Sequence, residues 1–288
     1  MGARAALAVL LLLQAGCTDR LGHGPALAEA AGWKWRIVTA GRFDLATASR
    51  AGAPGEMLTV FLEGDGLAYV TRSQPAQDPT PTEPLGLRLA LAHQGSGPLV
   101  WLGRPCQYTL SGHGRGCDQA FWTSRRYAPE VVASLGSALD TLKAASGAQD
   151  LLLVGYSGGG ALAALLAAER QDVVGLVTVA ANLDLAGWTA DGGLAPLTGS
   201  LDPALAAAPR LGLVPQWHFT GAEDRVTGTG AVLGFMQRLP VGAPAQLIEL
   251  PGFDHACCWA RDWNSLVAPA LNALPHRQSA AKMEKSHV

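Results

Sequence analysis

Short apolar runs alternate along the chain with longer segments that are rich in alanine and leucine. Runs with the length of buried strands lie at residues 57–62, 98–102, 151–154, 173–180, 216–220 and 245–250. Segments that favour helix lie at 85–93, 129–145, 161–170, 231–239 and 265–274. Two more strands are predicted at 33–38 and 43–48, joined by a hairpin turn around Gly41. This alternation predicts an α/β fold with a mostly parallel central sheet and helices on both faces.

One junction between a strand and a helix carries the clearest chemical signal. The apolar run Leu151–Val154 leads directly into Gly155-Tyr156-Ser157-Gly158-Gly159, and an alanine-rich helix follows. Glycine at 155 and 159 avoids crowding between the strand and the helix. Ser157 Oγ would then stand at the carboxyl edge of the sheet, with the N–H of Gly158 at the positive end of the helix. The alternative is a structural turn in which the serine only caps the helix.

Gly155-x-Ser157-x-Gly159 in this context resembles the nucleophile elbow of the α/β-hydrolases. The resemblance implies a Ser–acid–His order along the chain, each residue on a loop after a strand. The stretch QWHFT followed by GAEDRV resembles the acid loop of that family, and QLIEL followed by PGFDH resembles its histidine loop. The triad is therefore expected to be Ser157, Asp224 and His255. Asp184 and Glu223 remain alternative acids, and His218, which lies inside a predicted strand, is expected to be a core or edge residue.

The loop after the strand at 57–62 is the candidate for the second half of an oxyanion hole. Its sequence is Glu63-Gly64-Asp65-Gly66, and it resembles by position the loop that donates a backbone N–H in α/β-hydrolases, with Glu-Gly in place of the usual His-Gly. Asp65 or Gly66 would be the donor, together with Gly158. A plain tight turn is the alternative, since Gly-Asp-Gly favours turns.

The same glycines allow a different hypothesis. Gly158-x-Gly160-x-x-Ala163 matches a relaxed dinucleotide fingerprint, with Asp184 about twenty residues further on. A nicotinamide or flavin enzyme would follow from it. Against this, the motif lies in the middle of the chain, and it leaves the candidate acid and histidine without a role.

The N-terminus has the features of an export signal. Residues 1–17 combine Arg4 with an apolar stretch and end in Ala15-Gly16-Cys17. This ending resembles a bacterial lipoprotein signal, although Gln14 stands where an apolar residue is usual; simple cleavage is the alternative. We expect an exported protein of the periplasm or cell envelope, attached to a membrane only through a lipid on Cys17. A spacer at 18–32, one α/β-hydrolase domain at 33–275 and a disordered tail at 276–288 complete the expected organisation.

Export bears on the four cysteines that follow Cys17. Cys106 and Cys117 are expected to form a disulfide that closes a glycine-rich loop, worth about 3 kcal/mol in the loop-entropy account. His113 lies between them, but the spacing fits no common zinc pattern. For the adjacent Cys257 and Cys258, the sequence does not distinguish a vicinal disulfide from free thiols.

Composition narrows the function further. The 288-residue chain has a formal net charge of −2 and no basic segment, which argues against a nucleic-acid partner. The expected activity is cleavage of a small-molecule carboxylic ester, thioester or amide through an acyl-enzyme, without metal or organic cofactor. The stretches YSGGG, RPCQYT and GFDHACCW together resemble exported bacterial α/β-hydrolases of unsettled substrate. A peptidase, an acyltransferase and a non-catalytic anchored protein remain alternatives.

Overall fold

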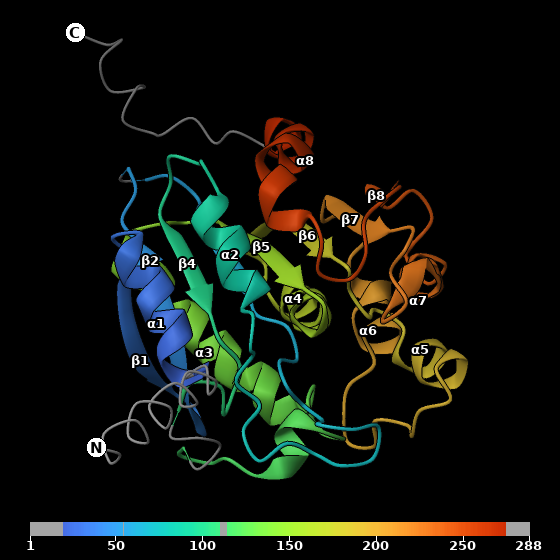
Figure 1. Ribbon diagram of the computed structural model, residues 1–288. Coiled ribbons are helices and arrows are strands. Elements are labelled where there is room, and N and C mark those ends of the chain that lie inside the picture. The colour runs from blue at the N-terminus through green and yellow to red at the C-terminus, as the bar shows by residue number, and fades with distance from the viewer. Residues whose placement is uncertain (1–19, 54, 110–113, 275–288) are drawn as a thin grey trace, which may run out of the picture.

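The fold is built on one eight-stranded sheet. The computed structural model describes residues 20–53, 55–109 and 114–274 (Figure 1). The strand order is β1-β2-β4-β3-β5-β6-β7-β8, with β2 antiparallel to β1 and β4 and all other neighbours parallel. The strands are β1 Lys34–Ala40, β2 Phe43–Arg50, β3 Leu58–Leu62, β4 Leu99–Leu102, β5 Leu151–Tyr156, β6 Val173–Val179, β7 Gln216–Gly221 and β8 Ala245–Leu250.

Helices cover both faces of this sheet (Figure 1). Helices α1, α2 and α8 pack into the hydrophobic core on one face, and α3, α4, α6 and α7 into the core on the other. The α-helices are α1 Arg20–Ala30, α2 Leu85–Ala92, α3 Pro129–Ser146, α4 Gly158–Glu169, α5 Leu185–Asp191, α6 Pro203–Ala206, α7 Gly228–Met236 and α8 Trp259–Ala273. Two short 3₁₀ helices lie at Gln119–Trp122 and Ala208–Arg210. The predicted α/β class, with a mostly parallel sheet between two helical layers, is confirmed.

Burial explains why the central strands have unbroken apolar sequences. All five residues of β3 and the first five of β5 are buried, because helices cover both sides of these strands. Each fully buried leucine contributes about 1.5–3 kcal/mol to folding. The edge strands β1 and β8 instead mix exposed and partly buried positions. The middle of the sheet is therefore the rigid part, and it is β5 that leads to Ser157.

Two expectations about the ends of the described chain were wrong. The segment expected to be a spacer contains helix α1, in which Gly24 and Ala28 are buried. Gly24 is a glycine for a packing reason, since a Cβ there would collide with the Tyr108 ring. Helix α8 begins at Trp259, six residues before the expected start at Ser265, because its buried side chains recur every three or four residues from Trp259 onward.

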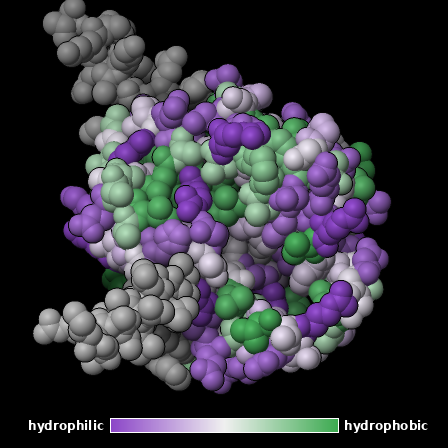
Figure 2. Space-filling model, viewed as in Figure 1, coloured by the Kyte–Doolittle hydropathy of each residue, from purple (hydrophilic) through white to green (hydrophobic). Residues whose placement is uncertain are grey.

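Polar and apolar residues are mixed on the surface of the described chain. Figure 2 shows hydrophobic and hydrophilic residues interspersed over the face seen in Figure 1. The most exposed large apolar side chains, Leu213 and Val241, lie in loops. Within the described ranges, no helix has the length and apolar character needed to cross a bilayer.

Candidate active site

Ser157 occupies the turn between β5 and α4 in a backbone conformation that side chains rarely adopt. Its φ is 51° and its ψ is −124°. Positive φ costs a non-glycine residue on the order of 1–3 kcal/mol, and such strain clusters at functional sites. The turn is held by a hydrogen bond from the Ser157 N–H to the Val179 carbonyl at 2.8 Å. The hydroxyl is thereby presented at the carboxyl edge of the sheet, as the motif predicts.

The glycines on either side of Ser157 are explained by close backbone contacts. A Cβ at Gly155 would collide with the carbonyl of Gly159, and a Cβ at Gly159 would collide with the carbonyl of Leu62. Helix α4 therefore starts in direct contact with β3 and β5. This contact brings the loop after β3 next to the serine.

Three residues from three strand ends form a continuous hydrogen-bond chain. Ser157 Oγ lies 3.1 Å from His255 Nε2, and His255 Nδ1 lies 2.9 Å from Asp224 Oδ2. Asp224 follows β7 and His255 follows β8, so the parallel strands deliver all three to one edge. The structure thus brings together the three residues that the sequence suggested.

The two alternative acids lie elsewhere. Asp184 caps helix α5, accepting from the Gly187 N–H at 3.1 Å, and its other oxygen lies 3.3 Å from Arg238 Nη1. Glu223 is exposed, and its N–H donates to the Phe253 carbonyl at 3.0 Å. His218 is fully buried within β7, which agrees with the expected core position.

Asp224 is held in its charged form. Burial alone would raise the pKa of this carboxyl, but His255 and the donors of the following turn lower the pKa to about 2. Those donors are the Val226 N–H at 2.7 Å and the Thr227 N–H and hydroxyl at 3.1 and 2.8 Å. A carboxylate so fixed accepts from His255 Nδ1–H and leaves Nε2 free to take a proton from the serine.

Neighbouring aromatic residues fix the loop that carries His255. The Tyr156 hydroxyl donates to the His255 carbonyl at 3.1 Å, and the Trp259 indole donates to the carbonyls of Asp254 and His255 at 3.0 and 3.2 Å. Just beyond the histidine, Cys257 is joined to Cys258 by a disulfide. The sequence left the state of this pair open, and the structure has it bonded.

On the opposite side of the serine, Glu63 anchors the loop that follows β3. Its side chain is 1% exposed and accepts four N–H bonds. The donors are the backbone of Gly64, Gly86 and Leu87, at 3.0–3.1 Å, and the indole of Trp101, at 2.9 Å. Burial raises the pKa of Glu63, whereas the four donors favour the carboxylate. Glu63 thus ties the loop to the start of helix α2.

Asp65 lies at the centre of a buried charge cluster beside Gly158. Its carboxylate forms ion pairs with Arg104 and with Arg126, the latter at 2.6 Å, and accepts from the Tyr127 hydroxyl at 3.0 Å. Burial opposes the charge, but the two guanidinium groups hold the pKa of Asp65 well below its usual value. A Cβ at Gly158 would collide with Asp65 Oδ1, so this side chain presses against the residue that follows the serine.

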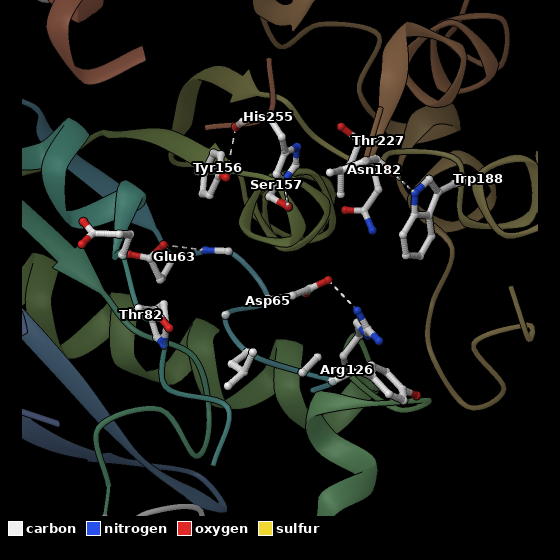
Figure 3. Close-up of a pocket in the computed structure, with 18 residues that line it drawn as sticks. Glu63, Asp65, Thr82, Arg126, Tyr156, Ser157, Asn182, Trp188, Thr227 and His255 are labelled. Carbon is white, nitrogen blue, oxygen red and sulfur yellow. Dashed lines mark hydrogen bonds and ion pairs between the residues drawn. The ribbon is translucent and has the colours of Figure 1, made fainter. Parts of the chain in front are cut away.

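A cavity of about 400 Å³ separates these two groups of residues. Figure 3 shows Ser157 and His255 on one side of it and Asp65 with Arg126 on the other. Asn182 and Trp188 also line it. Trp188 belongs to helix α5, in the segment between β6 and β7.

Comparison with known proteins agrees with this architecture. Neither a family model nor a curated protein sequence matches the chain. Among solved structures, an α/β serine hydrolase homologue from Coxiella burnetii shares 15% identity and superposes with a TM-score of 0.56, covering 83% of this chain and 97% of its own. An esterase from Pyrococcus furiosus shares 12% identity at a TM-score of 0.62, covering 85% and 93%. An α/β serine hydrolase without a lid from Xanthomonas campestris shares 14% identity at a TM-score of 0.53, covering 84% and 97%.

The chain has the α/β-hydrolase fold. Its sheet order and the antiparallel β2 differ from the 3-2-1-4-5-6 order of dinucleotide-binding domains. In addition, the Asp65 carboxylate faces the start of α4, where a pyrophosphate would have to bind. The dinucleotide hypothesis is therefore disfavoured by geometry and charge.

In this α/β-hydrolase fold, sequence reasoning missed most of the residues opposite the triad. Arg104 follows β4 and Asn182 follows β6, so the rule that ligand sites lie beyond the carboxyl ends of strands could have identified both. Arg126 and Tyr127 precede helix α3 in an irregular segment, and no sequence pattern marks them.

The remaining expectations concern the Cys106–Cys117 pair and the two ends of the chain. Cys106 and Cys117 are joined, with Cα atoms 5.6 Å apart. Since both sulfurs are bonded, neither is a thiolate that could bind zinc, and His113 lies outside the described residues. The signal segment 1–17, with Cys17, and the tail 276–288 also lie outside them.

Proposed function

We propose that the protein is a serine hydrolase that cleaves a carboxylic ester, or a related thioester or amide, through an acyl-enzyme. The observation that carries the proposal is the hydrogen-bond chain from Ser157 through His255 to Asp224. A serine hydroxyl needs a base within hydrogen-bond reach, and the base needs a partner that fixes its tautomer. The α/β-hydrolase fold of this chain supports the same reaction class, because its neighbours in structure include proteins described as esterases and serine hydrolases.

In the proposed mechanism, Ser157 Oγ attacks the acyl carbonyl carbon while His255 Nε2 takes the hydroxyl proton. Asp224 stabilises the imidazolium that forms. The tetrahedral intermediate then expels its alcohol, which receives the proton from His255. A water molecule, activated by the same histidine, attacks the acyl-enzyme and releases the acid.

The negative oxygen of the intermediate needs donors that are already in position. The N–H groups of Gly158 and Asp65 have no hydrogen-bond acceptor among the described residues. The Gly64 N–H, in contrast, is bonded to Glu63. We favour Asp65 over Gly66 as the second donor, because the Asp65 side chain contacts residue 158 directly. Each donor of this kind contributes about 3–4 kcal/mol to transition-state stabilisation.

The cavity favours a small-molecule substrate over a polypeptide. Its volume of about 400 Å³ lies in the range of small-ligand pockets. A carboxylesterase is therefore our first choice. A peptidase or an acyltransferase would use the same three residues, and a panel of esters, thioesters and aminoacyl amides separates these activities.

The proposal is tested by replacing the nucleophile. A fluorophosphonate probe should attach to Ser157, and Ser157→Ala should abolish labelling and lower turnover by on the order of 10⁶. Ser137→Ala, at an exposed position of helix α3, is the matched control and should leave both unchanged. Full ester turnover by a folded Ser157→Ala protein would contradict the proposal, and absence of labelling in the wild type would favour a non-catalytic protein.

Export remains a prediction from the sequence. We propose that Cys17 becomes a lipid-bearing N-terminus in the cell envelope. Cys17→Ser should then release the protein from the membrane fraction or block its processing. Mass spectrometry that finds an unmodified N-terminus at another residue would exclude the lipid anchor.

A further inference from the structure

The charge cluster opposite the triad has one cation more than its own carboxylate can neutralise. Asp65 carries a single negative charge, and both Arg104 and Arg126 pair with it. Both terminal nitrogens of Arg104 have a partner, since Nη1 binds Asp65 and Nη2 donates to the Arg126 carbonyl at 2.8 Å. The cluster therefore carries one net positive charge, and Arg126 is its arginine that lines the cavity.

Arg126 is nearly buried, yet one end of its guanidinium is unoccupied. Its side chain is 7% exposed. Nε donates to the Thr123 carbonyl at 2.8 Å and Nη1 to Asp65 Oδ2 at 2.6 Å, whereas Nη2 donates to no atom of the described chain. Because Arg126 lines the cavity, this free guanidinium donor is available to an acceptor that enters from solvent.

The other charged groups on the cavity wall do not compensate this cation. Both oxygens of Glu63 are occupied by N–H donors. Glu83 pairs with Arg88 at the surface. Asp224 does not line this cavity, and it is bound by His255 and by the turn that follows it. An anionic group that enters the cavity thus meets a cation whose remaining donor has no competing carboxylate.

We propose that Arg126 binds a carboxylate of the substrate, so that the preferred substrate is an ester with a free carboxylate a few bonds from its scissile carbonyl. The inference rests on the proposed serine hydrolase and names its substrate class. Asp65 pairs with Arg126 (Figure 3). Its side chain also contacts Gly158, so the guanidinium lies within the length of one side chain of the residue after the nucleophile. The Tyr69 ring, 6.0 Å from the guanidinium carbon, flanks the same group.

The guanidinium is held ready for this role. Although burial opposes its charge, Asp65 raises the pKa of Arg126 above its ordinary value, so the side chain stays charged at every pH of interest. The hydrogen bonds to Thr123 and Asp65 fix its orientation before substrate arrives. Charge-assisted hydrogen bonds to a pre-positioned guanidinium are about twice as strong as neutral ones.

A matched pair of esters tests the inference. The mono-p-nitrophenyl ester of glutaric acid carries the carboxylate, and its methyl ester has the same chain without the charge. The wild type should have the higher kcat/KM for the charged ester. Arg126→Met should lower the ratio of the two kcat/KM values by about 10- to 100-fold, mainly through KM of the charged ester. Arg126→Lys should recover part of the ratio.

Arg125→Met is the matched control. Arg125 is the neighbouring residue, but its side chain pairs with Glu130 and is 43% exposed. This variant should leave the ratio unchanged. An equal loss on both esters in Arg126→Met would mean that Arg126 only positions Asp65 and its loop, and would overturn the inference. A wild type that prefers the neutral ester would overturn it as well.

A binding measurement separates this inference from the proposed function. Glutarate should bind the wild type and Arg125→Met in calorimetry, and binding to Arg126→Met should be at least about 10-fold weaker. This result does not require catalysis. Glutarate binding without any ester turnover or phosphonate labelling would support the anion site and reject the hydrolase. Turnover of the neutral ester without glutarate binding would support the hydrolase and reject the anion site.

Discussion

The two walls of the cavity are built on different principles. On one wall, Ser157, Asp224 and His255 each follow a parallel strand, and the backbone alone brings them to the same edge. On the other wall, Asp65 and Arg126 come from loops far apart in sequence and are held together by buried charge. The first wall depends on the position of strand ends, which tolerates changes in side chains elsewhere. The second depends on each partner being present, so loss of one leaves another charge or donor buried without a partner.

After loss of the nucleophile itself, the largest expected effect is loss of the acid on the first wall. Asp224→Asn should lower kcat by on the order of 10⁴, because an amide cannot hold the imidazole tautomer or stabilise the imidazolium. Asn retains an oxygen for the Val226 and Thr227 N–H groups, so we expect little change in stability. Steady-state kinetics with a p-nitrophenyl ester and a thermal melt measure the two effects separately.

Asp184→Asn is the control for that substitution. Asparagine caps a helix as well as aspartate does, and the pair with Arg238 is partly exposed, so the loss of stability should stay within about 1 kcal/mol. Turnover should remain close to that of the wild type. If Asp184→Asn removed activity and Asp224→Asn did not, the catalytic acid would be Asp184. The hydrogen bond between Asp224 and His255 would then not be needed for catalysis.

The second wall depends on Glu63, which anchors the loop that carries Asp65. Glu63→Gln replaces an acceptor of four N–H bonds by a group that has one oxygen and two N–H donors of its own. At least one buried donor then lacks a partner, which should cost about 2–4 kcal/mol of unfolding free energy. Because Glu63 anchors the loop that carries Asp65, we also expect kcat to fall by about 10²-fold. Urea unfolding and ester kinetics measure the two losses.

Glu83→Gln is the matched control for the second wall. Glu83 also lines the cavity, but its side chain is 62% exposed and pairs with Arg88. Its substitution should change stability by less than about 1 kcal/mol. Comparable losses in Glu63→Gln and Glu83→Gln would show that the buried acceptor does not hold the loop.

The same contrast explains which parts of the molecule were predictable. The strands and the residues Ser157, Asp224 and His255 follow from local patterns, in which an apolar run ends in a short polar or glycine-rich turn. Strand boundaries came within two residues of the observed ones for this reason. By contrast, Arg126 has no local pattern, because its partner Asp65 is 61 residues away and only the folded chain brings them together.

Helix α1 was missed for another physical reason. Its small and weakly apolar residues resemble a linker, and Pro25 lies inside it. The helix is stabilised by its contact with the rest of the fold, where Gly24 meets the Tyr108 ring and Ala28 is fully buried. Tertiary packing of this kind overrides weak local propensity and leaves no trace in a sequence pattern.

The smallest expected effect is a pH dependence of the free energy of unfolding. It arises from one buried histidine in an element next to each wall. His218 lies in β7, which leads to Asp224, and His93 ends helix α2, whose first turn is held by Glu63. Burial lowers the pKa of His218 to about 3, and burial with the nearby Arg50 charge lowers the pKa of His93 to about 4. Both are therefore neutral in the folded protein, whereas in the unfolded chain they take up a proton near pH 6.5.

The stabilisation that comes from keeping these histidines neutral is consequently fully present above about pH 6.5. It decreases as the pH falls from there towards their pKa values in the folded protein, because the unfolded state binds more protons. Each histidine should cost about 2 kcal/mol between pH 7 and pH 5. Asp224 does not contribute in this window, since its lowered pKa of about 2 means that its stabilisation is lost only below about pH 4. Urea unfolding at both pH values should show the decline in the wild type, and His218→Gln and His93→Gln should each remove about half of it. A decline that persists unchanged in one variant would show that folding does not lower the pKa of this histidine, and would contradict its assigned contribution.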